Sequence, residues 1–244
     1  GGTWAALTPA VPAAPPTALA AVGVGDPEPA PLAQGAPTAE ALGWRMSIQC
    51  YSFNKDTFFE SVDRAVRMGV KVVEMYPGQR VAADQPWQTN QNQPPEALQA
   101  IQTKLAATGV KVANFGVTGI PADEPGRRRL FDWAKTLGIE TLCVEPDPAA
   151  LPGLDTLCQE YGTNLALHNH PAPSRYWNPQ TVLDACQGLS PRIGACADNG
   201  HWMRSGVNPL EAIALLQGRI ITFHFKDLNQ MGKGAHDVHW GTGQ

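Results

Sequence analysis

One segment near the C-terminal end of the sequence places two potential metal ligands directly after an apolar run. Residues 193–197 are small or apolar, and Asp198 and His201 follow them. Such a run is typical of a strand buried on both faces, so we expect Asp198 where the strand ends. A turn at Gly200 would then bring His201 back beside it. A carboxylate and an imidazole together suit a divalent cation, although an Asp that caps a turn and a His on a loop are the alternative interpretation.

Polar side chains also stand at the ends of the other predicted strands. His168 and His170 are two residues apart, so both are expected to point to the same side, and His224 and Lys226 repeat this spacing. Burying such groups without partners would cost several kcal/mol, whereas a shared metal or substrate site would satisfy them together. The residues at these ends are Glu74, Asn114, Glu145, His168, His170, Asp198, His201, His224, Lys226 and Asp227.

Single members of this set allow more than one role. His170 could orient His168 through a hydrogen bond, as partners of metal ligands commonly do. Glu74 and Glu145 could be ligands, acid/base groups or hydrogen-bond partners of a substrate. Trp202 could stack on a sugar, although a single tryptophan on a loop more often packs against the protein.

The elements that would position these residues alternate between strand and helix. Seven short strands are predicted at 46–50, 70–75, 110–115, 139–144, 164–167, 192–197 and 219–225. The helices between them are predicted at 56–68, 94–107, 124–137, 148–161, 178–186 and 208–216, with Asp56 as the N-cap of the first. This alternation indicates parallel pairing through right-handed crossovers.

The repeats lack the Gly-x-Gly-x-x-Gly turn of dinucleotide-binding sheets, so we expect a (β/α)8 TIM barrel of the α/β class. The barrel is predicted over residues 44–244, and its eighth strand would lie beyond Gln244, so the barrel looks truncated after the seventh strand. In a TIM barrel the chemistry takes place at the C-terminal ends of the strands, which is where the polar residues stand.

Composition excludes several other classes of protein. The 244 residues are 43% hydrophobic and carry a net charge of −4, which predicts neither a nucleic-acid nor a membrane partner. Five cysteines without a Cys-x-x-Cys pair predict buried thiols. Residues 1–43 are rich in Ala and Pro and predict a disordered tail or linker. Such a tail could follow an export signal or be an ordinary extension, so the protein could be cytoplasmic or exported, and an oligomer is possible.

Three motifs in residues 44–244 resemble the xylose isomerase-like TIM barrels, which include sugar phosphate isomerases and epimerases. They are Leu-Ala-Leu-His-Asn-His, Ile-Gly-Ala-Cys-Ala-Asp-Asn-Gly-His-Trp and Ile-Ile-Thr-Phe-His-Phe-Lys-Asp. The resemblance implies a divalent metal ion (Mn, Mg, Co or Zn) held by a Glu, an Asp, a His and a final Glu. In the epimerase members the two glutamates also exchange the substrate's proton.

The resemblance matches Asp198 and His224 to the family's Asp and His, and His201 to a histidine that contacts substrate. His168 stands where the family has its first Glu, and the final Glu would lie beyond Gln244. A histidine at 168 could still bind the metal, and a neutral imidazole could act as a base near pH 7.

An apurinic-site endonuclease branch of the same superfamily is a further alternative. It carries an Asp-x-His after the histidine of the seventh strand, and this chain has Asp237 and His239 there. The first two predicted strands end without the histidines that this branch needs, and an acidic chain is a poor partner for DNA.

We therefore predict a metal-dependent isomerase or epimerase of a small sugar, sugar phosphate or keto-sugar, which transfers a proton next to a carbonyl. A non-catalytic sugar-binding barrel and an enolate-type lyase or hydrolase of oxidised glycosides are the alternatives. The predicted metal ligands are His168, Asp198 and His224. The predicted catalytic residues are His168, Glu145 and Lys226. The predicted substrate contacts are His201, His170, Glu74 and Trp202.

Overall fold

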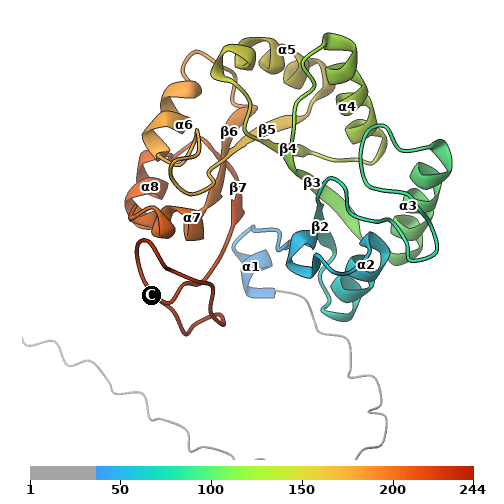
Figure 1. Ribbon diagram of the computed structural model, residues 1–244, viewed down its shortest axis with the longest axis horizontal. Helices are drawn as coiled ribbons and strands as arrows, with labels where there is room; N and C mark the ends of the chain where they lie inside the picture. Colours follow the sequence, from blue (N-terminus) through green and yellow to red (C-terminus); the bar gives the residue numbers. More distant parts are fainter. Residues whose placement is uncertain (1–36) are drawn as a thin grey trace, which may run out of the picture. The chain divides into compact units, whose positions relative to one another are not determined.

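The computed structural model describes residues 37–244, which form one sheet of seven strands with helices along its outer side (Figure 1). The strands are β1 (Ile48–Gln49), β2 (Val72–Met75), β3 (Lys111–Thr118), β4 (Thr141–Val144), β5 (Asn164–His168), β6 (Ile193–Asp198) and β7 (Ile220–His224). The helices are α1 (Pro37–Ala41), α2 (Phe58–Arg67), α3 (Pro95–Thr108), α4 (Glu124–Thr136), α5 (Leu151–Tyr161), α6 (Pro179–Ala185), α7 (Asn199–Arg204) and α8 (Pro209–Leu215). Two short 3-10 helices, η1 (Cys50–Phe53) and η2 (Pro148–Ala150), complete the set.

The strands pair in parallel and in the order of the sequence, from β1 to β7. The sheet curls into a half-barrel, with β1 and β7 at its two edges. This arrangement confirms the predicted parallel α/β architecture and all seven predicted strands. The eighth strand stays a prediction.

Local sequence signals explain where the helices begin and end. Thr57 and Glu60 form a capping box at the start of α2, so the N-cap is Thr57 rather than the predicted Asp56. Helices α3 and α5 end at Gly109 and Gly162, whose φ angles are 69° and 71°. Only glycine adopts this left-handed conformation without a steric cost, which is why both helices stop there.

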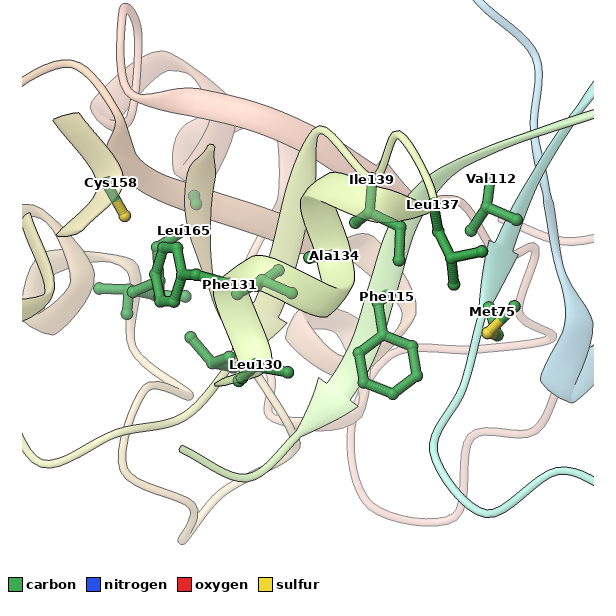
Figure 2. Packing of buried hydrophobic residues seen from close by; sticks show 14 of the residues in the cluster. Met75, Val112, Phe115, Leu130, Phe131, Ala134, Leu137, Ile139, Cys158 and Leu165 are labelled. Carbon is green, nitrogen blue, oxygen red and sulfur yellow. The ribbon is translucent and has the colours of Figure 1, made fainter. Parts of the chain in front are cut away.

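A large apolar core lies between the strands and the helices. Figure 2 shows Leu130, Phe131 and Ala134 on α4, and these residues pack in one cluster with Phe115 of β3 and Leu165 of β5. All five side chains are fully buried. Removing each large apolar side chain from water contributes about 1.5–3 kcal/mol, so this layer holds the helices against the sheet.

A smaller cluster fills the inner side of the curled sheet. It consists of Cys143, Ala166 and Cys196, with Ile221 packed against it. Because strand side chains alternate between the two faces, the residues two positions further along each strand face the same inner side. At the C-terminal ends of β4, β5 and β6 the inner side therefore changes from these small residues to Glu145, His168 and Asp198.

Some features differ from the expectation. Helix α7 begins directly after β6, so a helix rather than a turn at Gly200 brings His201 back towards Asp198. Residues 1–36 of the predicted tail lie outside the described residues. Helix α1 lies in the rest of the predicted tail, residues 37–43, where no helix was predicted. All five cysteines are buried and free, as predicted. None of the helices between residues 37 and 244 has both the length and the apolar character that crossing a bilayer requires.

Candidate functional site

The carboxylate of Asp198 lies at the centre of a cluster formed by the ends of β5, β6 and β7. Its Oδ2 atom is 3.7 Å from Nε2 of His168, 3.5 Å from Nε2 of His201 and 3.9 Å from Nδ1 of His224. The same oxygen accepts a hydrogen bond from Nζ of Lys226. Three imidazoles and an ammonium, from the ends of β5 and β7 and from α7, thus surround one carboxylate oxygen.

The backbone around Asp198 is fixed by a side chain that sequence reasoning missed. Asn169 accepts a hydrogen bond from the Asp198 N–H at 2.8 Å and donates one to its carbonyl at 2.9 Å. Oδ1 of Asp198 accepts from the N–H of His201 at 2.8 Å, which caps α7 and leaves Oδ2 for the cluster. Burial alone would raise the pKa of Asp198, but the contact with His168 and the charge of Lys226 hold it well below its usual value. Asp198 is therefore a carboxylate near neutral pH.

Glu145, which follows β4, links two histidines. Its Oε1 lies 3.2 Å from Nδ1 of His168 and is also hydrogen-bonded to Nδ1 of His170. Burial would raise the pKa of Glu145, but these two contacts outweigh it and lower the pKa to about 2. His168 is 2% exposed and lies between two carboxylates, whereas the side chain of His170 is 48% exposed.

His201 is held in its neutral form. Its Nε2 lies 3.4 Å from Nζ of Lys226, and its Nδ1 lies 3.3 Å from Nη1 of Arg204. Burial lowers the pKa of His201 to about 3, although the charge of Asp198 opposes this shift. A neutral imidazole can accept a hydrogen bond or bind a metal ion.

Glu74, near the end of β2, forms a hydrogen bond with His224. Its Oε1 lies 3.0 Å from Nε2 of His224 and accepts a hydrogen bond from Gln49, and its Oε2 accepts one from Asn114. Burial would raise the pKa of Glu74, but the charge and hydrogen bond of His224 lower it. Burial would lower the pKa of His224, but the charge of Glu74 raises it well above its usual value. Both oxygens of Glu74 have partners and its side chain is buried, so it is placed to orient His224 rather than to contact a substrate as predicted.

The donor atoms of the cluster fit a divalent ion. Two groups of potential ligands have donor atoms within 4.8 Å of one another at the strand ends: His168, Asp198 and His201, and Glu145, His168 and His170. Carboxylate oxygen and imidazole nitrogen are the donors that Zn, Mn and Co bind well. Nδ1 of His224 lies 3.9 Å from the same Asp198 oxygen, but His168, Asp198 and His224 are not among the groups of described residues whose donor atoms all lie within 4.8 Å of one another, so an ion held by these three side chains would draw them closer together. Lys226 shares this oxygen, and an ion bound here would compete with its ammonium.

A third group of potential ligands lies one layer deeper on the inner side of the sheet. It consists of Cys143, Cys196 and His224, again with donor atoms within 4.8 Å of one another. Both thiols are fully buried. Hydrogen bonding with Cys196 and burial raise the pKa of Cys143 well above its usual value, and burial raises that of Cys196. The sequence predicted that both cysteines are buried, but it did not predict that they lie next to each other and to His224.

A cavity of about 500 Å³ opens beside Glu145 and His170. Its volume is in the range of small-molecule sites. The remaining wall comes from the segments that follow β3 and β4 and from α4, and includes Thr118, Arg127 and Asp147. Arg127 donates from Nε and Nη2 to the backbone carbonyls of residues 121 and 122, so it is part of the scaffold of this wall.

Two residues that the sequence suggested lie away from the cluster. Trp202 is fully buried in the core between the sheet and the helices, so it has no face free for a sugar, because α7 turns it inward. Asp237, of the Asp-x-His considered above, forms an ion pair with Arg204 at 2.8 Å and is not among the potential ligand groups of the described residues.

Comparisons with known proteins agree with this architecture. An uncharacterized protein from Parabacteroides distasonis ATCC 8503 is 30% identical, with a TM-score of 0.66 and coverage of 82% of this chain and 81% of that chain. A xylose isomerase-like TIM barrel protein from Mycobacterium smegmatis, in complex with magnesium, is 13% identical, with a TM-score of 0.63 and 83% coverage of both chains. The 3-keto-D-glucoside 4-epimerase of E. coli is 13% identical, with a TM-score of 0.55 and coverage of 75% of this chain and 79% of that chain.

No curated protein matches the sequence. The family described as xylose isomerase-like TIM barrel matches residues 62–244. This range includes strands β2 to β7. With this match and the parallel, curled sheet, the chain belongs to the xylose isomerase-like TIM barrel family.

Proposed function

We propose that this chain is a divalent-metal-dependent isomerase or epimerase of a small sugar or keto-sugar, which moves a proton at a carbon next to a carbonyl. The observation that supports this most is the position of Asp198 Oδ2, 3.7 Å from Nε2 of His168 and 3.9 Å from Nδ1 of His224. A divalent ion (Mn, Mg, Co or Zn) held by these three side chains would polarise the substrate's carbonyl and acidify the neighbouring C–H. The E. coli relative, an epimerase of a keto-glucoside, is consistent with this class of reaction.

We assign His168 to holding the ion rather than to moving the proton. Its imidazole is buried, with Nδ1 at Glu145 and Nε2 facing Asp198, so neither nitrogen is directed to a substrate carbon. The hydrogen bond from Nδ1 to Glu145 keeps Nε2 as the nitrogen with the free electron pair. This is the common arrangement of a metal-bound histidine and its carboxylate partner.

We assign the proton transfer to the pair formed by Glu145 and His170. A carboxylate with a pKa of about 2 is a weak base near neutral pH, so Glu145 acts by orienting and polarising His170. The imidazole of His170 is half exposed and lines the cavity beside Glu145. With Nδ1 bonded to Glu145, Nε2 of His170 is the atom that takes the proton from the substrate carbon. In an isomerase the same atom delivers it to the neighbouring carbon, whereas an epimerase needs a second acid on the opposite face of the substrate.

Lys226 and His201 complete the proposal as partners of the substrate's oxygen atoms. The ammonium group of Lys226 has three N–H donors and donates one hydrogen bond to Asp198. Its other N–H groups can donate to a carbonyl or hydroxyl oxygen of the substrate. Its distance of 3.4 Å from Nε2 of neutral His201 places a cation and a neutral imidazole side by side. Together they would stabilise the negative charge that develops on oxygen when the proton leaves.

Solvent deuterium exchange tests this function. The protein, loaded with Mn2+, is incubated in D2O with a panel of ketoses and keto-glucosides, and proton NMR follows the carbon next to the carbonyl. We expect deuterium at that carbon in at least one sugar. His170→Gln should lower the exchange rate by about 100-fold with unchanged metal content, whereas His236→Gln, an exposed histidine outside the cluster, should leave the rate unchanged.

Two outcomes would contradict the proposed reaction, and a third would contradict the role of His170. A sugar that binds without any exchange in the metal-loaded protein would indicate the non-catalytic sugar-binding barrel instead. Elimination or hydrolysis of an oxidised glycoside, seen as new products in the same spectra, would indicate the lyase or hydrolase alternative. Full exchange activity in His170→Gln would move the proton transfer to another residue.

A further inference from the structure

The two thiols on the inner side of the sheet lie directly beneath the polar cluster. Cys143 is two residues before Glu145 on β4, and Cys196 is two residues before Asp198 on β6. Because alternate residues of a strand share a face, each thiol occupies the layer below its acidic neighbour. A nitrogen of His224 is within 4.8 Å of both sulfur atoms.

From this arrangement we propose that Cys143, Cys196 and His224 form a second metal site, which takes a thiophilic ion such as Zn2+, Cd2+ or Cu+. Two sulfur donors and one imidazole are a common ligand set for these ions, and an open fourth position would remain for water or another ligand. The site is chemically distinct from the cluster above it, whose donors are imidazole nitrogens and carboxylate oxygens without sulfur.

The distances are close to those that such an ion requires. Zn–S and Zn–N bonds of about 2.3 and 2.0–2.1 Å place tetrahedral ligand atoms about 3.4–3.8 Å apart. The donor atoms here are all within 4.8 Å of one another, so each pair needs to approach by at most about 1.0–1.4 Å to close the site. Such shifts are within the reach of a change in side-chain rotamer and need no movement of the strands.

The surroundings favour sulfur as the ligand. The other members of the layer, Ala166 and Ile221, carry no polar side chain. On β3 the backbone approaches Cys143 so closely that a Cβ on Gly116 would be 2.4 Å from the Cβ of Cys143. A larger side chain at position 116 would therefore clash with Cys143.

Occupation of this site has a consequence for the cluster above, which rests on the proposed function. His224 is the residue that both sites share, and its imidazole cannot coordinate in the lower layer without turning away from Asp198 or giving up its hydrogen bond to Glu74. A thiophilic ion would thus remove one ligand from the catalytic ion. We expect Cd2+ to inhibit the exchange reaction, and the thiols to be the cause.

Binding must displace the thiol protons. A cysteine thiol is ordinarily protonated near neutral pH. Each cysteine binds as a thiolate and His224 binds as a neutral imidazole, so binding of Cd2+ releases protons to the buffer. This release needs no oxidant, and both sulfur atoms keep their oxidation state.

Cadmium titration of the chelator-treated protein tests the proposal without any turnover, so its result is independent of the proposed function. We expect an ultraviolet sulfur-to-cadmium charge-transfer band that saturates at one equivalent, with the release of protons. Cys143→Ser and Cys196→Ser should each lose the band. Cys158→Ser and Cys186→Ser, which change buried cysteines elsewhere, should keep it.

If a serine variant fails to fold, cadmium NMR of the unmodified protein decides the question. A chemical shift typical of two sulfur ligands supports the site, and a shift typical of oxygen and nitrogen ligands alone overturns it. The absence of a charge-transfer band at one equivalent, or a band that persists in both Cys143→Ser and Cys196→Ser, would also overturn it.

Discussion

Nε2 of His224, at the end of β7, lies 3.0 Å from Oε1 of Glu74, at the end of β2, although 150 positions separate the two residues. The buried carboxylate of Glu74 forms a hydrogen bond with Nε2 of His224, and Nδ1 of His224 faces Oδ2 of Asp198 at 3.9 Å. Glu74 therefore determines which nitrogen of His224 is available to a metal ion.

Replacing Glu74 should weaken metal binding without removing any ligand. In Glu74→Gln the charged partner of His224 is lost, so we expect the affinity for Mn2+ to fall about 10- to 100-fold, as measured by calorimetry. Glu140→Gln, which changes an exposed carboxylate paired with Arg45, is the matched control and should bind Mn2+ normally. An unchanged affinity in Glu74→Gln would mean that this hydrogen bond does not orient a ligand.

Removing the ammonium of Lys226 should destabilise the ion-free protein. Lys226→Met leaves the buried carboxylate of Asp198 without its cation, and we expect unfolding in chelator to become easier by about 1–3 kcal/mol. A divalent ion at the same carboxylate should restore most of this loss. Lys104→Met, which breaks a more exposed pair with Asp63, should cost less than about 1 kcal/mol and show no rescue by metal. Denaturant titrations with and without Mn2+ measure both effects, and equal losses without rescue would contradict this role.

His201 should make the ion-free protein sensitive to acid. Burial lowers the pKa of His201 to about 3, so as the pH falls below about 6.5 the unfolded chain takes up the proton before the folded one does. The stability that neutral His201 contributes is therefore present above pH 6.5 and is lost progressively towards pH 3.

The variant His201→Gln has no such group to titrate. Between pH 7 and pH 5 in chelator, we expect it to lose about 1–2 kcal/mol less stability than the unmodified protein. His236→Gln should behave like the unmodified protein. Identical pH profiles for His201→Gln and the unmodified protein, from denaturant titrations at each pH, would show that His201 is not held neutral.

Gly194 should tolerate no side chain, because β6 and β7 approach each other there. A Cβ on Gly194 would lie 2.1 Å from the backbone oxygen of Arg219 and 2.9 Å from Ile221. We expect Gly194→Ala to lower the free energy of unfolding by about 1–3 kcal/mol or more. Gly153→Ala is the control, because the nearest atom is 3.9 Å away and the site is inside α5, where alanine should be neutral or stabilising. A Gly194→Ala protein as stable as the control would mean that the strands can separate here without cost.

The sequence allowed the strands and most helices to be predicted because apolar runs and glycine stops are local signals. Gly109 and Gly162, for example, end their helices as expected. The six-residue α7 was not predicted, since its N-cap is Asp198, a residue already interpreted as a ligand. This is also why Trp202 was expected on a loop, although it packs in the core.

For the site, the sequence predicted which residues stand at the strand ends but not how they pair. The proximity of His168 and Asp198 followed from the parallel order of their strands. The pairing of Glu74 with His224, and of Cys143 with Cys196, depends on how far the sheet curls, which no local pattern in the sequence encodes. Asn169 was not predicted, because its hydrogen bonds join it to the backbone of Asp198 on another strand, and no local pattern in the sequence indicates this contact.

The stoichiometry of Mn2+ binding tests the central claim most directly, because Mn2+ prefers oxygen and nitrogen ligands and discriminates against the thiol site. Equilibrium dialysis should find one ion per chain in the unmodified protein and none at the same free concentration in Asp198→Asn. Asp147→Asn, which changes an exposed carboxylate at the rim of the cavity, should retain the ion. Equal binding by the unmodified protein and Asp198→Asn would contradict the account, because the ends of β5, β6 and β7 would then not share an ion.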